Sequence, residues 1–142
     1  MIVSRTVTVD RPIETVFAYL SDFTTTTQWD PGTVRTVRAD GDGGVGTVYQ
    51  NTSRFAGRET ELTYVVTDRR APELIALRGE NSTIVATDTM TLAATPAGTR
   101  VTYRAAFTFK GGWKLAAPFL GPAFRHLGDE AEAGLRAALT AL

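Results

Sequence analysis

The chain has 142 residues, of which 43% are hydrophobic and 21% charged, and fifteen basic residues balance fifteen acidic ones. This length predicts a single domain over residues 1–142 that can bury a core without disulfides or metals, and the neutral charge argues against nucleic acid as a partner. No stretch approaches the roughly 20 apolar residues of a membrane span and the start is too polar for a signal peptide, so we expect a cytoplasmic protein.

The first third of the chain predicts one strand and two short helices. Residues 2–9 alternate between apolar and polar side chains, as a strand with one buried face does. Pro12 suits the first turn of a helix, which apolar residues at helical spacing continue to about Ser21. A threonine run over residues 23–29 predicts a second short helix or turn, which the Asp-Pro-Gly sequence at residues 30–32 ends.

Six further strands are expected in the middle of the chain. Clusters of Gly, Pro, Asn or Asp separate them, as turns require. The last two are the longest, and the short link at residues 96–98 predicts that they form an antiparallel hairpin. The six expected ranges are 34–39, 46–55, 58–68, 74–78, 82–94 and 100–110.

After Gly111 and Gly112 the apolar residues recur every three or four positions up to Leu142, which predicts a long C-terminal helix. Pro118 and Pro122 predict a kink or a separate first turn in its first third. An antiparallel sheet must cover its apolar face, and this helix is long enough to do so. The sequence therefore predicts an α+β fold in which a curved antiparallel sheet of about seven strands wraps around the C-terminal helix.

Four segments in this order carry a family resemblance: residues 9–17, residues 21–23 with 28–31, the hairpin at 95–102 and the helix at 115–142. With them the chain resembles the SRPBCC superfamily, the helix-grip fold of START domains and birch-pollen-allergen-like proteins, and within it the polyketide cyclase/dehydrase-like branch of small bacterial proteins. The resemblance implies a hydrophobic cavity between sheet and helix. It also implies that members bind lipids, polyketides, hormones or other apolar small molecules, and that some catalyse aromatic ring closure.

Along the longest strands, every second side chain is mainly apolar. We expect these side chains to face the helix and to line such a cavity. Trp29 is added as an aromatic at its mouth, and two phenylalanines come from the irregular first third of the helix, where we expect an entrance or movable wall. Each apolar member has a structural alternative as a core filler, and Trp29 as a plug between the short helices and the sheet. The expected ligand-binding residues are Trp29, Tyr64, Asp88, Met90, Tyr103, Phe107, Phe119 and Phe124.

Three of these residues, Tyr64, Asp88 and Tyr103, are polar. A buried phenol or carboxylate needs a partner, because leaving it unpaired costs free energy. A carbonyl or hydroxyl group of a ligand can supply that partner. For Asp88 the structural alternatives are an ion pair, for example with Arg78 on the neighbouring strand, or exposure of the side chain by a bulge.

Groups that usually carry chemistry are few. The absence of cysteine excludes disulfides and thiol catalysis, and a single histidine argues against a His-rich metal site. That histidine, His126, is weighed as a general base against a helical pair with Glu130 four residues later. Residues 43–46 are rich in glycine but precede no helix, so they do not form a dinucleotide loop. We expect no metal and no cofactor, and assign no catalytic residue.

Two functions compete on this basis. The first is binding of a hydrophobic small molecule, such as a lipid, polyketide or other aromatic metabolite, in the cavity. The second is a polyketide cyclase or dehydratase, which needs a cavity to fold the substrate and one acid or base from among Tyr64, Asp88, Tyr103 and His126. A partner-binding subunit with a vestigial cavity ranks behind both. Binding ranks first because no residue constellation demands chemistry, and the exposed edge strands leave a homodimer open.

Overall fold

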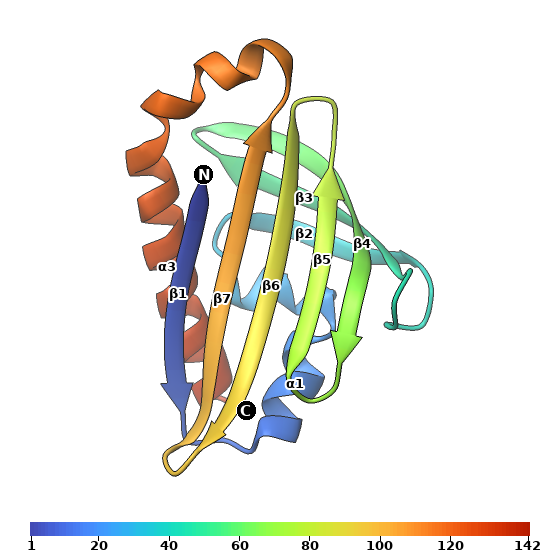
Figure 1. Ribbon diagram of the computed structural model, residues 1–142, viewed down its shortest axis with the longest axis vertical. Coiled ribbons are helices and arrows are strands. Elements are labelled where there is room, and N and C mark those ends of the chain that lie inside the picture. Colours follow the sequence, from blue (N-terminus) through green and yellow to red (C-terminus); the bar gives the residue numbers. More distant parts are fainter.

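The computed structural model describes residues 1–142, whose strands form one seven-stranded antiparallel sheet (Figure 1). Strands that follow each other in the chain pair with each other, except that β1 pairs with β7. The predicted α+β class and the number of strands are confirmed. In spatial order the strands are β1 (Ile2–Val9), β7 (Gly98–Phe109), β6 (Ile84–Thr95), β5 (Leu74–Glu80), β4 (Arg58–Arg70), β3 (Val48–Phe55) and β2 (Thr33–Asp40).

The helices come in two groups. Between β1 and β2 lie α1 (Ile13–Leu20), the 3₁₀ turn η1 (Phe23–Thr25) and α2 (Thr26–Trp29). After β7, the 3₁₀ turns η2 (Gly111–Leu115) and η3 (Ala117–Phe119) lead into α3 (Gly121–Thr140). Pro118 lies in η3 and Pro122 in the first turn of α3, so the separate turns predicted before the long helix are present.

The sheet curls because several of its strands are irregular. The pairing of β2 with β3 shifts register twice, and β4 has a shift against β5 between Val66 and Asp68. Such bulges bend a strand and increase its twist. In Figure 1, β2 and β3 pass behind the other strands, and α3 runs on that same side behind β1. The sheet therefore grips α3, as a helix-grip fold does.

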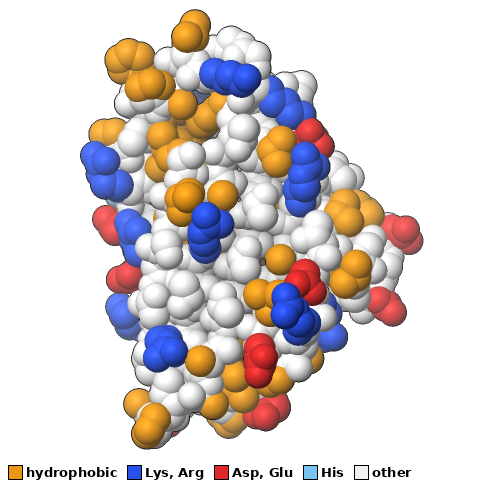
Figure 2. Space-filling model, in the orientation of Figure 1, with side chains coloured by type: hydrophobic (Ala, Val, Ile, Leu, Met, Phe, Trp, Pro, Cys, Tyr) orange, Lys and Arg blue, Asp and Glu red, His pale blue; other side chains and the backbone are white.

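The side of the sheet that faces α3 holds the core, a single cluster of 24 buried hydrophobic residues. The parity predicted for β6 and β7 is confirmed, since Ala86, Met90, Val101 and Ala105 are all buried. The opposite face of the sheet is mostly neither hydrophobic nor charged, with Lys and Arg scattered over it (Figure 2). No helix of the structure combines the length and apolarity that crossing a membrane requires.

The C-terminal half of α3 is held firmly. Leu135 and Leu139 are fully buried, and Arg11 donates hydrogen bonds to the carbonyl oxygens of Thr140 and Leu142. A cation placed there also offsets the negative end of the helix dipole. The turns before the other end of the helix are exposed, and Leu115 and Phe119 are 79% and 83% accessible. In Figure 2, hydrophobic side chains gather over this end of the molecule.

Candidate functional site

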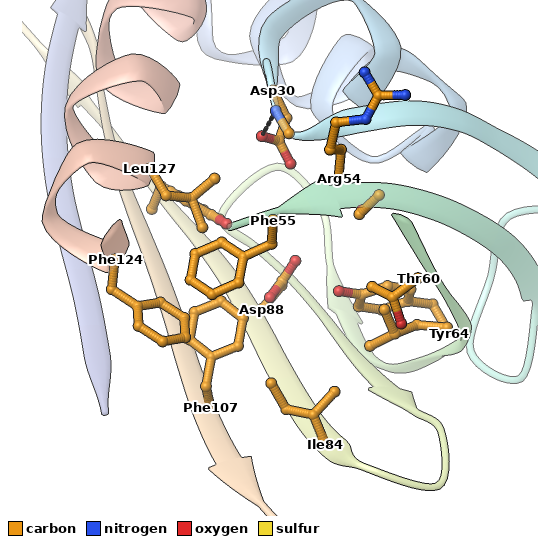
Figure 3. A pocket seen from close by; sticks show the side chains of 14 residues that line it. Asp30, Arg54, Phe55, Thr60, Tyr64, Ile84, Asp88, Phe107, Phe124 and Leu127 are labelled. Atoms are coloured by element: carbon orange, nitrogen blue, oxygen red, sulfur yellow. Dashed lines mark hydrogen bonds between the residues drawn. The ribbon is translucent and has the colours of Figure 1, made fainter. Parts of the chain in front are cut away.

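A cavity of about 100 Å³ lies between the sheet and the first two turns of α3 (Figure 3). Its walls come from β3, β4, β6, β7, α3 and the turn between α2 and β2, and they are mainly apolar. The lining residues are Asp30, Gly32, Ser53, Arg54, Phe55, Thr60, Leu62, Tyr64, Ile84, Asp88, Tyr103, Phe107, Phe124 and Leu127.

Three phenylalanines form one wall of the cavity. The ring of Phe124 lies 4.6 Å from that of Phe55 and 4.7 Å from that of Phe107, measured between centroids. Figure 3 shows these rings together, with Leu127 above them. Phe124 and Leu127 belong to the first two turns of α3, so a shift of this end of the helix would change the width of the cavity.

Asp88 points into the cavity without a partner. It is only 8% exposed, and no hydrogen bond reaches its buried Oδ1. The ion pair with Arg78, weighed as a structural alternative, does not form, because Arg78 donates instead to Glu80 at 2.8 Å. The register of the two strands explains this. Asp88 lies opposite Leu77, whereas Arg78 lies opposite Thr87, so the side chains of Asp88 and Arg78 point to opposite faces of the sheet.

Burial raises the pKa of Asp88 to about 7, and the negative charge of Asp30 adds to the rise. Desolvation acts in this direction because it disfavours the charged form of the carboxyl group. Near neutral pH the group is therefore divided between its acid and carboxylate forms. A carboxyl in that condition can give or take a proton at little cost.

Two phenols, Tyr64 and Tyr103, share the cavity with Asp88. Burial raises the pKa of each well above its ordinary value, the charge of Asp88 raises it further, and no hydrogen bond lowers either. Both hydroxyls therefore keep their protons and can donate. The ring of Tyr64 lies against Gly79, where a Cβ atom would come within 2.6 Å of it, and the ring of Tyr103 packs edge-on against Trp29 at 5.4 Å.

The charged residues at the rim already have partners. Asp30 accepts hydrogen bonds from the backbone N–H of Gly32 and the hydroxyl of Thr33, both at 3.0 Å, although burial still raises its pKa. Arg54 is the only basic residue of the lining. Its Nη2 lies 3.4 Å from Oε2 of Glu59, and Figure 3 shows the guanidinium turned away from the cavity.

A buried polar cluster fixes the position of α2, and with it that of Asp30. The hydroxyls of Thr26 and Thr36 lie 2.7 Å apart, and Asn51 donates to Thr36 at 2.9 Å. These bonds join α2 to β2 and β3. The turn after α2 is thereby held over one side of the cavity.

Five of the eight residues predicted to bind a ligand line this cavity together: Tyr64, Asp88, Tyr103, Phe107 and Phe124. Trp29 and Met90 are buried but do not belong to the lining, and Phe119 is exposed on η3. His126 has a side chain that is 74% exposed, and its Nε2 lies 2.9 Å from Glu130, so the predicted helical pair is present.

Sequence reasoning did not single out Asp30, Phe55, Thr60 or Leu127 as lining residues. One signal was available: extending the inward parity of β4 backwards from Tyr64 leads to Thr60. For Asp30 the sequence indicates only the end of a helix. Whether its side chain reaches the cavity depends on where α2 lies in the fold.

A second hollow, of about 390 Å³, is polar and open to solvent. Arg38 and Arg69 line it together with Asp22 and Asp42. Both carboxylates already accept hydrogen bonds from backbone N–H groups of their own turns. This hollow does not offer the apolar walls that a hydrophobic molecule requires.

The whole chain, residues 1–142, matches the family model described as polyketide cyclase / dehydrase and lipid transport. No curated protein matches.

Similar solved structures include the Zhui aromatase/cyclase from a Streptomyces species, at 16% identity and a TM-score of 0.80, covering 97% of this chain and 92% of that one. A START superfamily protein from Mycobacterium smegmatis is 18% identical with a TM-score of 0.73, covering 99% and 94%. The protein TTHA0849 from Thermus thermophilus is 12% identical with a TM-score of 0.82, covering 99% and 98%. At these identities the likeness shows a common fold.

Proposed function

This chain belongs to the polyketide cyclase / dehydrase and lipid transport family, and we propose that it binds a hydrophobic small molecule, such as a lipid, polyketide or other aromatic metabolite, between its sheet and α3. The observation that carries the proposal is an apolar cavity with a buried carboxylate oxygen that has no partner in the chain. A buried polar group left unpaired costs about 1–3 kcal/mol. A bound molecule that pairs with it recovers that cost.

The small size of the cavity indicates that part of its wall must move before such a molecule can enter. At about 100 Å³ it is smaller than most ligand sites, which measure roughly 300–1,000 Å³. Entry of a larger ligand therefore requires a wall of the cavity to move, and the wall formed by Phe55, Phe107 and Phe124 is one of them. This wall includes the first turn of α3, at the end opposite the one that Arg11 holds. We propose that this wall opens to admit the ligand.

Filling the cavity from one side tests the binding function. Thr60 lines the cavity from β4, so Thr60→Phe places a phenyl ring in the space that the ligand needs. Titration with N-phenylnaphthylamine, a neutral dye that fluoresces in apolar surroundings, should show affinity reduced at least tenfold, equivalent to about 1.4 kcal/mol.

The matched control is Thr63→Phe, on the same strand but with its side chain exposed on the opposite face. This variant adds the same ring without touching the cavity, so its dye affinity should equal that of the wild type. Equal affinity of the wild type and Thr60→Phe would place the dye elsewhere and contradict the proposed function.

Asp88 supports a second candidate function, a cyclase or dehydratase acting on a molecule folded in the same cavity. A carboxyl with a pKa of about 7 in apolar surroundings has the properties of a general base, and two protonated phenols beside it can donate to a developing oxyanion. Such a site can remove a proton next to a carbonyl group, which ring closure by aldol addition requires.

The base can be probed without the natural substrate. In Kemp elimination a base removes the C–H proton of nitrobenzisoxazole, the N–O bond breaks, and a coloured cyanonitrophenolate forms. The wild type should accelerate this reaction with a rate that rises through pH 7, as the carboxylate form of Asp88 appears. Asp88→Asn should reduce the rate at least a hundredfold. A rate that is equal in the two proteins would remove the support that Asp88 gives to catalysis.

A further inference from the structure

Asp88, Tyr64 and Tyr103 line one part of the cavity, which we call its inner end, and present a specific set of hydrogen-bonding groups there. In its ionised form, Asp88 offers a carboxylate oxygen that accepts and has no donor in the chain. Tyr64 and Tyr103 offer hydroxyl groups that keep their protons and have no acceptor. All three side chains line the one cavity, and Figure 3 shows Tyr64 beside Asp88, across from the phenylalanine wall. The set therefore comprises one acceptor and two donors.

We infer that the ligand carries a neutral hydroxyl group, alcoholic or phenolic, which lies against Asp88, Tyr64 and Tyr103 when the ligand is bound. This inference rests on the proposed binding function. A hydroxyl group has one hydrogen to donate and two lone pairs that accept. It can therefore donate to Asp88 while it accepts from both tyrosines, which pairs every group in the set.

Other end groups leave part of the set unpaired. A ketone accepts from the two tyrosines but has nothing to donate to Asp88. An ammonium group donates to Asp88 but cannot accept from either tyrosine. In a desolvated site, an unmatched polar group weakens binding much more than a missing apolar contact does. The hydrogen-bond inventory thus favours a hydroxyl over both.

Charge argues against a carboxylate ligand such as a fatty acid anion. Asp30 and Asp88 are the acidic residues of the lining, and the negative charge of Asp30 adds to the rise in the pKa of Asp88. The one basic residue, Arg54, is turned away and lies beside Glu59. A ligand carboxylate at the inner end would meet Asp88 with no cation between them, and like charges in an apolar cavity repel strongly.

Three probes that share one ring system test this inference. Naphthalene, β-naphthol and β-naphthoic acid differ only in their end group, and at pH 7.5 the naphthol is neutral while the naphthoate is ionised. Calorimetric titration of the wild type should give the naphthol at least tenfold tighter binding than either of the others. In Asp88→Asn, which removes the charge but keeps an acceptor, the naphthoate should gain at least tenfold. Asp40→Asn, at an exposed position of β2, should leave all three affinities unchanged.

The outcomes separate the inference from the function on which it rests. Equal affinities for the three probes would overturn the hydroxyl assignment and leave apolar binding standing. Tightest binding of the naphthoate, lost in Arg54→Gln, would also overturn it by placing a carboxylate at the rim. If none of the three binds, both the inference and the proposed function are contradicted.

Discussion

Asp88→Asn should stabilise the protein more strongly as the pH rises. Burial raises the pKa of Asp88 in the folded protein to about 7, from an ordinary value of 3.8. Between these values the folded protein keeps a proton that the unfolded chain releases, so the free energy of unfolding of the wild type falls as the pH increases. Above pH 7 the free energy of unfolding of the wild type stays lower by roughly 4 kcal/mol, because each pH unit between the two pKa values of Asp88 costs ~1.4 kcal/mol.

Asparagine has no proton to release and is free of this dependence. The melting temperature of Asp88→Asn, relative to that of the wild type, should therefore be roughly 10 °C higher at pH 8 than at pH 4. Chemical denaturation at the two pH values gives the same quantity as a free energy. The exposed substitution Asp40→Asn serves as the control and should follow the wild type. Parallel pH profiles of the wild type and Asp88→Asn would show that Asp88 is not a buried carboxyl without a partner.

Gly134→Ala should destabilise the protein by about 3 kcal/mol, a lowering of the melting temperature by roughly 10 °C. The middle of α3 passes so close to the end of α2 that a Cβ atom at Gly134 would lie 1.9 Å from the carbonyl oxygen of Trp29. Neither backbone can give way without moving a whole element. The shift would also displace the turn at Asp30, which borders the cavity.

The sign of this effect is informative, because alanine stabilises an exposed helix interior by ~1 kcal/mol over glycine. A gain of that size in Gly134→Ala would contradict the close packing of α3 on α2. Gly112→Ala is the matched control, since a Cβ atom there meets nothing within 4 Å. Its melting temperature should stay close to that of the wild type.

The inward residues of the strands could be predicted from the sequence because side-chain parity is a local property. It placed Tyr64, Asp88 and Tyr103 on the correct face of the sheet, and the structure gathers them in one cavity. Whether Asp88 pairs with Arg78 could not be predicted in this way, because it depends on the register of β5 against β6. That register sets Leu77 opposite Asp88 and leaves Arg78 on the other face.

Residues from irregular segments could not be placed in the same way. Phe119 was expected in the wall, but the two 3₁₀ turns before α3 carry it into solvent, and apolar spacing does not tell where such a turn points. Asp30 and Phe55 reach the cavity through the position of α2 and the curl of the sheet. Both depend on contacts between segments far apart in the sequence, such as the bond from Asn51 to Thr36.

The location of a bound probe shows whether a ligand lies between the sheet and α3. The methyl groups of Leu62, Ile84 and Leu127 line the cavity, whereas those of Val45 and Leu115 are exposed outside it. With β-naphthol bound to methyl-labelled protein, nuclear Overhauser effects should join the protons of the naphthol rings to the first three residues. Contacts confined to Val45 or Leu115 would show that the probe binds at the surface, and would contradict a ligand cavity between the sheet and α3.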